Sequence, residues 1–117
     1  IGPSAKTAVP ALIQTLEDPS EWPRNSSAVA LGKIGSAATA AVPGLTRALQ
    51  DENIYVRVSA AFALVDISNE TDVALPVLRE ALNVRGALTD KQRARLLEMI
   101  EAESSTGGGE SSAGRRE

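Results

Sequence analysis

The sequence contains no cysteine and no histidine, and it has only one tryptophan, one tyrosine and one phenylalanine. The first two absences exclude a disulfide framework, zinc sites built from these residues, a thiol nucleophile, a histidine-dependent triad and an imidazole pH sensor. The 117 residues, 43% of them hydrophobic, are enough for one domain and too few for two. We therefore expect one ordered domain that works without these chemistries.

Neither sign of charge dominates, with 12 basic and 15 acidic side chains and a net charge of -3. A domain that binds nucleic acid usually carries a basic stripe, so we expect no nucleic-acid partner. The longest uncharged stretch, Ile34 to Thr46, is broken by Pro43 and is too short to cross a bilayer, so we expect no membrane partner. No signal-peptide pattern opens the chain, but it starts at Ile1 rather than Met and is expected to come from something longer. The compartment stays open, with the cytoplasm favoured.

The sequence repeats itself at a fixed offset of 33 residues. Residues of the first copy that return in the second include Ile1, Val9, Pro10, Leu12, Leu16, Asp18, Arg24, Ala28 and Leu31, which match Ile34, Val42, Pro43, Leu45, Leu49, Asp51, Arg57, Ala61 and Leu64. A third copy continues the pattern, and its offset grows to 36 residues across the insertion Arg85-Gly86-Ala87. These matches predict three repeats, at about 1–33, 34–67 and 68–103.

Each copy is expected to form two helices. The first has apolar residues at helical spacing and one proline (Pro10, Pro43 or Pro76), which is tolerated in the first turn and kinks a helix if it lies deeper. The second is preceded by a residue that can cap it, namely Ser20, Asn53 or Thr89. Thr89 with Gln92 also makes a capping box.

A pair of helices this short cannot bury its apolar stripe alone, whereas stacked pairs share one continuous core. The predicted fold is therefore all-α, a right-handed α-solenoid of about three two-helix repeats over residues 1–103. Alanines on the second helices let these helices approach their neighbours: Ala28, Ala30, Ala60, Ala61 and Ala63. Residues 104–117 are mostly serine and glycine and are predicted to form a disordered tail.

Three segments carry a family resemblance: Ala8-Val9-Pro10-Ala11-Leu12, Ala30 to Gly35, and Val56 to Leu64. They resemble the HEAT-like repeats first recognised in phycobilisome lyase subunits. The resemblance covers residues 1 to about 103 and implies a repeat solenoid, while such repeats occur in proteins with different functions. Ile1-Gly2 matches the end of a repeat, so an upstream repeat of the same parent chain is expected. The third copy lacks the acidic turn residue that matches Asp18 and Asp51.

The search for catalytic chemistry is largely negative. Gly32-Lys33-Ile34-Gly35 lacks the spacing and the following Ser or Thr of a phosphate loop and is expected to be a helix end with an exit glycine. The carboxylate pairs Glu17-Asp18 and Asp51-Glu52 are expected to be solvated turns. We therefore expect no catalytic residue, no metal and no cofactor.

Two arginines recur at a fixed distance from turn carboxylates, Arg24 after Asp18 and Arg57 after Asp51. One interpretation is an anion-binding row. The favoured one is a structural ladder, in which each arginine bonds turn carboxylates and helix-end carbonyls of neighbouring repeats.

The aromatic residues fall on one face of the second helices. In the second copy this face carries Tyr55, Ser59, Phe62 and Asp66, and in the first copy Trp22, Ser26, Val29 and Lys33. The third copy places Lys91, Arg95, Glu98 and Ala102 there. Because this face usually lines the concave side of HEAT-like solenoids, the expected partner-binding residues are Trp22, Val29, Lys33, Tyr55, Phe62, Asp66 and Arg95. The alternative is that Trp22 and Tyr55 fold back over the joint between repeats.

These patterns favour a non-catalytic protein-binding or scaffold module, whose partner is a protein helix or an extended segment. One alternative is a bilin-lyase-like subunit that acts on a tetrapyrrole, for which Arg95 with Lys91 is the only nearby basic pair. Another is a purely structural spacer in a longer array.

Overall fold

The computed structural model describes residues 2–103, with side chains from Thr7 onward. Its elements are α1 (Gly2–Thr15), α2 (Glu21–Ile34), the 3-10 helix η1 (Gly35–Ala41), α3 (Val42–Ala48), α4 (Ile54–Ser68), α5 (Thr71–Ala81) and α6 (Asp90–Glu103). Because this range contains helices and turns and no strand, the all-α prediction is confirmed. The tail predicted over residues 104–117 lies outside the described residues.

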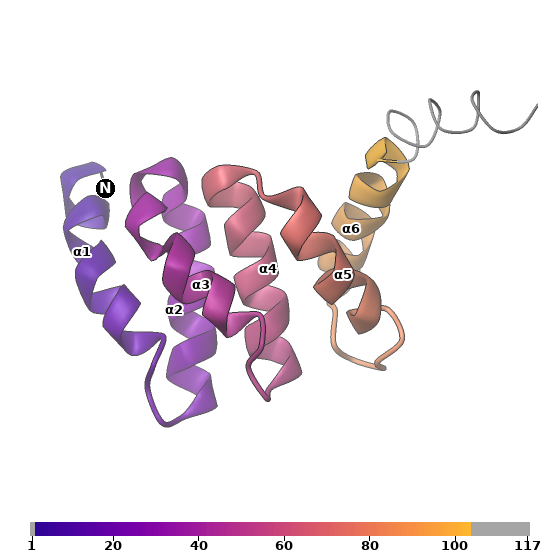
Figure 1. Ribbon diagram of the computed structural model, residues 1–117, viewed down its shortest axis with the longest axis horizontal. Helices are drawn as coiled ribbons and strands as arrows, with labels where there is room; N and C mark the ends of the chain where they lie inside the picture. The colour runs from indigo at the N-terminus through magenta and orange to yellow at the C-terminus, as the bar shows by residue number, and fades with distance from the viewer. Residues whose placement is uncertain (1, 104–117) are drawn as a thin grey trace, which may run out of the picture. The chain divides into compact units, whose positions relative to one another are not determined.

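Helices α1 to α5 belong to one compact unit, which ends at Ala87, and α6 belongs to a second unit, which begins at Leu88. Within the first unit α2 and α4 lie side by side, α1 packs against α2, and α3 and α5 pack against α4 (Figure 1). Each second helix therefore contacts both its own first helix and the second helix of the neighbouring pair. This arrangement is the one that two stacked helix pairs require to share a core.

Leucines and alanines fill the interior of the first unit. Each of α2, α3, α4 and α5 contributes one leucine without exposed surface: Leu31, Leu45, Leu64 and Leu78. Burial of such a side chain contributes about 1.5–3 kcal/mol. Three of the predicted small residues, Ala28, Ala60 and Ala61, are also fully buried. The core is thus continuous from the first helix pair into α5.

The caps of the second helices differ in how they are made. The Asn53 side chain accepts bonds from the N–H groups of Tyr55 (2.8 Å) and Val56 (3.2 Å). In the second unit Thr89 and Gln92 form the predicted capping box, with bonds of 2.9 and 3.0 Å. Ser20 lies at the predicted position, but its side chain makes no capping bond, so that part of the prediction is wrong. Its N–H instead donates to the Asp18 carboxylate (2.8 Å), which closes the turn before α2.

Helix α2 ends as predicted at a glycine, because Gly35 adopts φ 77° and its N–H bonds the carbonyl of Leu31. The run Glu21–Ala48, which includes this end, is long and apolar enough by length and composition to cross a membrane. In the structure it is divided among α2, η1 and α3, and Ala38 within η1 has non-helical angles (φ -101°, ψ 24°). The run is therefore not one continuous helix. Pro43 lies in the first turn of α3, where a proline is tolerated.

Two glycines lie where helices come close together. A Cβ atom on Gly32 of α2 would lie 3.1 Å from the backbone Cα of Ala63 in α4. A Cβ atom on Gly44 of α3 would lie at the same 3.1 Å, but from Cδ1 of Leu16, the far end of a flexible side chain. The α2–α4 contact thus requires glycine in a way that the contact at Gly44 does not.

We therefore expect Gly32→Ala and Gly44→Ala to have different effects on stability. Alanine is better than glycine in a helix by about 1 kcal/mol. At Gly32 the backbone of α4 has to move, and we expect the free energy of unfolding to fall by about 1 kcal/mol or more. At Gly44 Leu16 can rotate away, and we expect no loss or a gain of up to about 1 kcal/mol. Urea unfolding followed by circular dichroism measures both, and equal effects would contradict the close-approach argument.

Candidate functional site

The beginnings of α2 and α4 are joined by an arginine that spans two repeats. Arg24 donates from Nε and Nη2 to the two carboxylate oxygens of Asp51, at 2.8 and 3.0 Å. Its Nη1 donates to the backbone carbonyls of Asp18 (3.0 Å) and Pro19 (3.1 Å). Each side chain of the ion pair is only 12% exposed. A two-pronged bond of this kind fixes orientation as well as distance. One side chain thus holds the turn before its own helix and the turn of the next repeat.

The environment of Asp51 favours its charged form. Burial by itself raises the pKa of Asp51, but the bonds from Arg24 and from the N–H of Asn53 outweigh it, and the pKa is lowered. The bond to Asp51 in turn raises the pKa of Arg24. The pair is therefore ionised over the whole neutral and mildly acidic range.

Arg57 repeats the position of Arg24 but not all of its bonds. Its Nη1 donates to the carbonyls of Asp51 (2.8 Å) and Glu52 (3.2 Å). The position matching Asp51 in the third copy is Val84, which has no carboxylate. The backbone turns nevertheless match, since the N–H groups of Asp51 and Val84 each donate at 3.1 Å to the carbonyl three residues earlier. The structure thus contains one complete rung of the expected ladder, meaning one arginine that bonds both the carbonyls of its own turn and the carboxylate of the next repeat.

The expected partner-binding row is exposed along α2 and interrupted on α4. On α2, Trp22 is 72% and Val29 40% exposed, and Ser26 and Lys33 are exposed as well. On α4, Tyr55 is 50% exposed, and Asp66 is exposed near the other end of the helix. Trp22 and Tyr55 are the second residues of α2 and α4, and both rings keep at least half of their surface exposed.

The expected exposure of Phe62 is wrong. Phe62 is only 7% exposed, and Ser59, one turn before it, is 8% exposed. The reason is the position of α4, which packs against α2, η1, α3 and α5 and is therefore covered around most of its circumference. A helix in such a place has no separate outer face in its middle. Phe62 is accordingly a packing residue.

The expected residues of the third copy lie on α6. Arg95 is half-buried, and Lys91 and Glu98 are exposed. These residues belong to the second unit, whereas Trp22, Val29, Lys33, Tyr55, Phe62 and Asp66 belong to the first.

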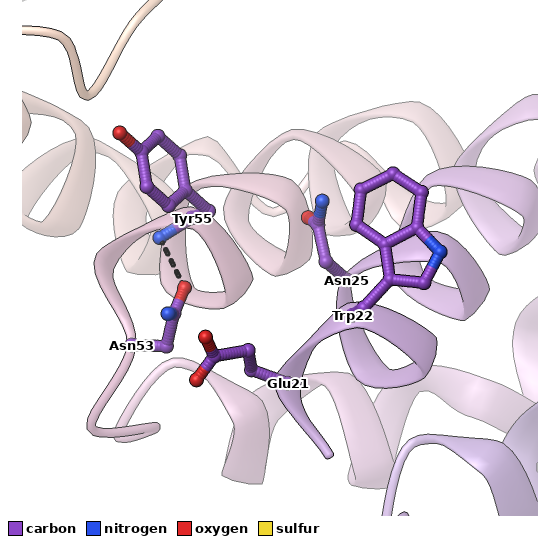
Figure 2. A pocket seen from close by; sticks show the side chains of 5 residues that line it. All are labelled: Glu21, Trp22, Asn25, Asn53 and Tyr55. Carbon is purple, nitrogen blue, oxygen red and sulfur yellow. Dashed lines mark hydrogen bonds between the residues drawn. The ribbon is translucent and has the colours of Figure 1, made fainter.

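A mostly apolar hollow of about 410 Å³ lies at the beginnings of α2 and α4. It is lined by Glu21, Trp22, Asn25, Asn53 and Tyr55. Figure 2 shows the two aromatic rings on either side, with Asn25 between them and the Glu21 carboxylate near Asn53. The structure thus brings together Trp22 and Tyr55, two of the expected partner-binding residues.

Three lining residues were not expected at this site from the sequence: Glu21, Asn25 and Asn53, of which Asn53 was identified only as a cap. The Asn25 side-chain oxygen accepts a hydrogen bond from the Ser59 hydroxyl, which links α2 to α4 at the hollow. Asn25 lies one turn after Trp22, and this spacing on one helix is a signal that could have identified it. The partner Ser59 could not be identified in this way because the repeat offset pairs Asn25 with Val58.

Within residues 2–103, no group of three or more acidic side chains lies close enough together to hold a metal ion.

Comparison with known proteins agrees with the repeat architecture. Residues 9–98 match the family model of HEAT repeats, which is most of the chain. No curated protein matches the sequence.

We expect Asp51→Asn to remove part of the acid sensitivity of folding. Because the folded-state pKa of Asp51 is lowered, its contribution to stability is complete above the ordinary value of about 3.9 and is lost as the pH falls through the lowered value. The variant should melt on the order of 5 °C lower at pH 7, and this difference should shrink toward the acidic end. Thermal unfolding between pH 2 and 7 measures it. The control is Glu17→Gln, because the Glu17–Arg47 pair (3.3 Å, side chains 65% and 66% exposed) should contribute little. A pH-independent difference for Asp51→Asn would contradict the argument.

We expect Val84→Asp to supply the missing carboxylate of the second rung. The turn at Val84 repeats the turn at Asp51, and Arg57 stands where Arg24 stands. The variant should raise the melting temperature by a few degrees, an effect that high salt reduces. The double variant Val84→Asp, Arg57→Lys should lose most of this gain in melting temperature, because lysine cannot bond a carboxylate through two parallel N–H groups. A gain that survives this second change would show that the ladder is not its cause.

Proposed function

Because the chain belongs to the HEAT-repeat family, we propose that it is a non-catalytic protein-binding or scaffold module whose partner docks on the second helices α2 and α4. HEAT repeats generally mediate protein–protein interaction or scaffolding, and the family is typically non-enzymatic. The observation that carries the proposal is the pair of exposed rings, Trp22 and Tyr55, which flank one mostly apolar hollow. Tryptophan and tyrosine are the residues on which binding energy most often concentrates.

The surroundings of the hollow favour binding without rearrangement. The Arg24–Asp51 bonds join α2 to the turn before α4, and the Asn25–Ser59 bond joins α2 to α4 itself. A surface that is already ordered loses little conformational entropy when a partner docks. The partner, a helix or an extended segment, would cover the rings and release the water around them.

Val29 and Lys33 extend the surface along α2. Val29 lies two turns after Trp22 on the same face and is 40% exposed, and Lys33 is exposed one turn further on. On α4, Asp66 is exposed close to Gly32, since a Cβ atom there would lie 3.7 Å from Oδ2 of Asp66. In this proposal the two charged residues form a polar rim, and Phe62 supports α4 from within.

Two finer assignments belong to the same proposal. The motifs Ala8 to Leu12 and Ala30 to Gly35 support the phycobilisome-lyase type of HEAT-like repeat. Asp18 supports an upstream repeat, because its carboxylate accepts a bond from the Ser20 N–H and has no arginine partner within residues 2–103. In a longer array an arginine of the preceding repeat would occupy the place that Arg24 has on Asp51.

Selection from a random peptide library displayed on phage tests the proposal. We expect selected peptides to bind the wild type and to lose at least about tenfold in affinity for the double variant Trp22→Ala, Tyr55→Ala. The control is Val73→Ala on α5, which removes an apolar side chain with 39% exposure away from the hollow. Circular dichroism should give the same helical signal for all three proteins.

Two outcomes would contradict the proposal. Peptides that bind the double variant as well as the wild type would place binding elsewhere, and the absence of any selected peptide would favour a spacer. A shifted absorbance spectrum after addition of a bilin would instead support a bilin-lyase-like subunit.

A further inference from the structure

We propose that the hollow between Trp22 and Tyr55 binds a proline-rich segment in the polyproline II conformation, with two prolines three residues apart and a basic residue beside them. This inference rests on the proposed function and names the chemistry of the partner. It is carried by three properties of the hollow: the spacing of its rings, the kind of hydrogen-bonding groups it leaves available, and the position of one carboxylate.

The spacing of the rings follows from the repeat. Trp22 and Tyr55 are each the second residue of their helix, and α2 and α4 pack directly against each other. Helices in contact have axes about 8–10 Å apart, so the backbone positions from which the two rings project are separated by about this distance. A polyproline II segment rises about 3.1 Å per residue and has three residues per turn, which places its residues i and i+3 on one face about 9.3 Å apart. One proline can therefore lie against each ring.

The available polar groups of the hollow are mainly donors. The side-chain oxygen of Asn25 is occupied by Ser59, and that of Asn53 by the N–H groups that it caps. Their amide NH2 groups have no hydrogen-bond partner within residues 7–103, where side chains are described, and neither has the Trp22 indole N–H, which can only donate. A proline-rich segment has the opposite character, because proline has no N–H and the carbonyls of polyproline II make no internal bonds. The site offers donors where such a ligand offers acceptors.

The charge at the hollow indicates a basic neighbour. Glu21 lines the hollow beside Trp22, is exposed, and forms no ion pair with any residue of the described range. An arginine of the partner could stack on the Trp22 ring and pair with this carboxylate. At the other ring, Tyr55 Oη lies near Gly86, where a Cβ atom would be 3.9 Å away. The two ends of the hollow therefore differ, and this difference gives the bound segment a direction.

Trp22 is the only tryptophan of the chain, so its fluorescence reports directly on the hollow. The probe is a short synthetic peptide with an arginine and two prolines three residues apart. We expect titration of this peptide to shift the Trp22 emission to shorter wavelength and to saturate, because the 72% exposed ring becomes covered. Tyr55→Ala should weaken binding about tenfold or more, whereas Tyr55→Phe, which keeps the ring, should bind nearly as the wild type does.

Two further comparisons test spacing and charge. A peptide of the same composition with its prolines four residues apart should bind about tenfold more weakly, because only one proline can then meet a ring. Glu21→Gln should weaken binding of the arginine peptide about two- to fivefold, and should leave unchanged the binding of a peptide with alanine in place of arginine.

The inference is overturned if the emission does not shift with peptide at about 1 mM, or if the respaced peptide binds equally well. It is also overturned if an arginine peptide without prolines binds as tightly, since the hollow is then a site for cations. These failures are distinct from failure of the proposed function. Library peptides that lack the proline spacing but still require Trp22 and Tyr55 would uphold partner binding while removing this ligand.

Discussion

The bidentate bond from Arg24 to Asp51 fixes the position of the second helix pair relative to the first. The exposed surface formed by both pairs depends on this bond. The same Asp51 carboxylate also accepts the N–H of Asn53 (2.9 Å), and Asn53 caps α4. The arginine, the turn and the start of the next helix are therefore one connected group. Glu21, Trp22 and Asn25 lie within three positions of Arg24, and Asn53 and Tyr55 lie within four of Asp51. The Arg24–Asp51 bond therefore also positions the residues that line the hollow.

The side chains that hold the helix pairs together are distinct from the exposed rings of the proposed binding site. Arg24 and Asp51 are mostly covered, and their bonds are made within the protein. The rings of Trp22 and Tyr55 are exposed, and their side chains make no hydrogen bond within residues 7–103. Substitutions of the rings should therefore have little effect on the stacking of the helices. This independence lets one repeat scaffold present different surfaces.

The sequence predicts the helices and much of their ends because these depend on local chemistry. The offset of 33 residues, the capping box at Thr89 and the exit glycine Gly35 each act within a few residues of chain. The prediction for Phe62 failed because burial depends on how many elements surround a helix. Residue spacing shows on which face of α4 Phe62 lies, but it does not show whether another element covers that face. Ser20 failed for a related reason: the Asp18 carboxylate bonds the Ser20 backbone and closes the turn without the hydroxyl. Asn25 and Ser59 are 34 residues apart, one more than the repeat offset, so a comparison of residues matched at that offset does not pair them.

The joint between the second and third copies differs from the joint between the first two, because Val84 stands at the position that matches Asp51. Between the first two repeats an ion pair with two parallel bonds resists both sliding and rotation. Arg57 bonds only the backbone carbonyls of Asp51 and Glu52, in the turn before its own helix, and among the described residues no carboxylate of the third copy bonds it. The joint between the second and third copies therefore lacks the side-chain ion pair that joins the first two copies. The hollow lies at the joint that has the ion pair, since it is lined by residues at the beginnings of α2 and α4.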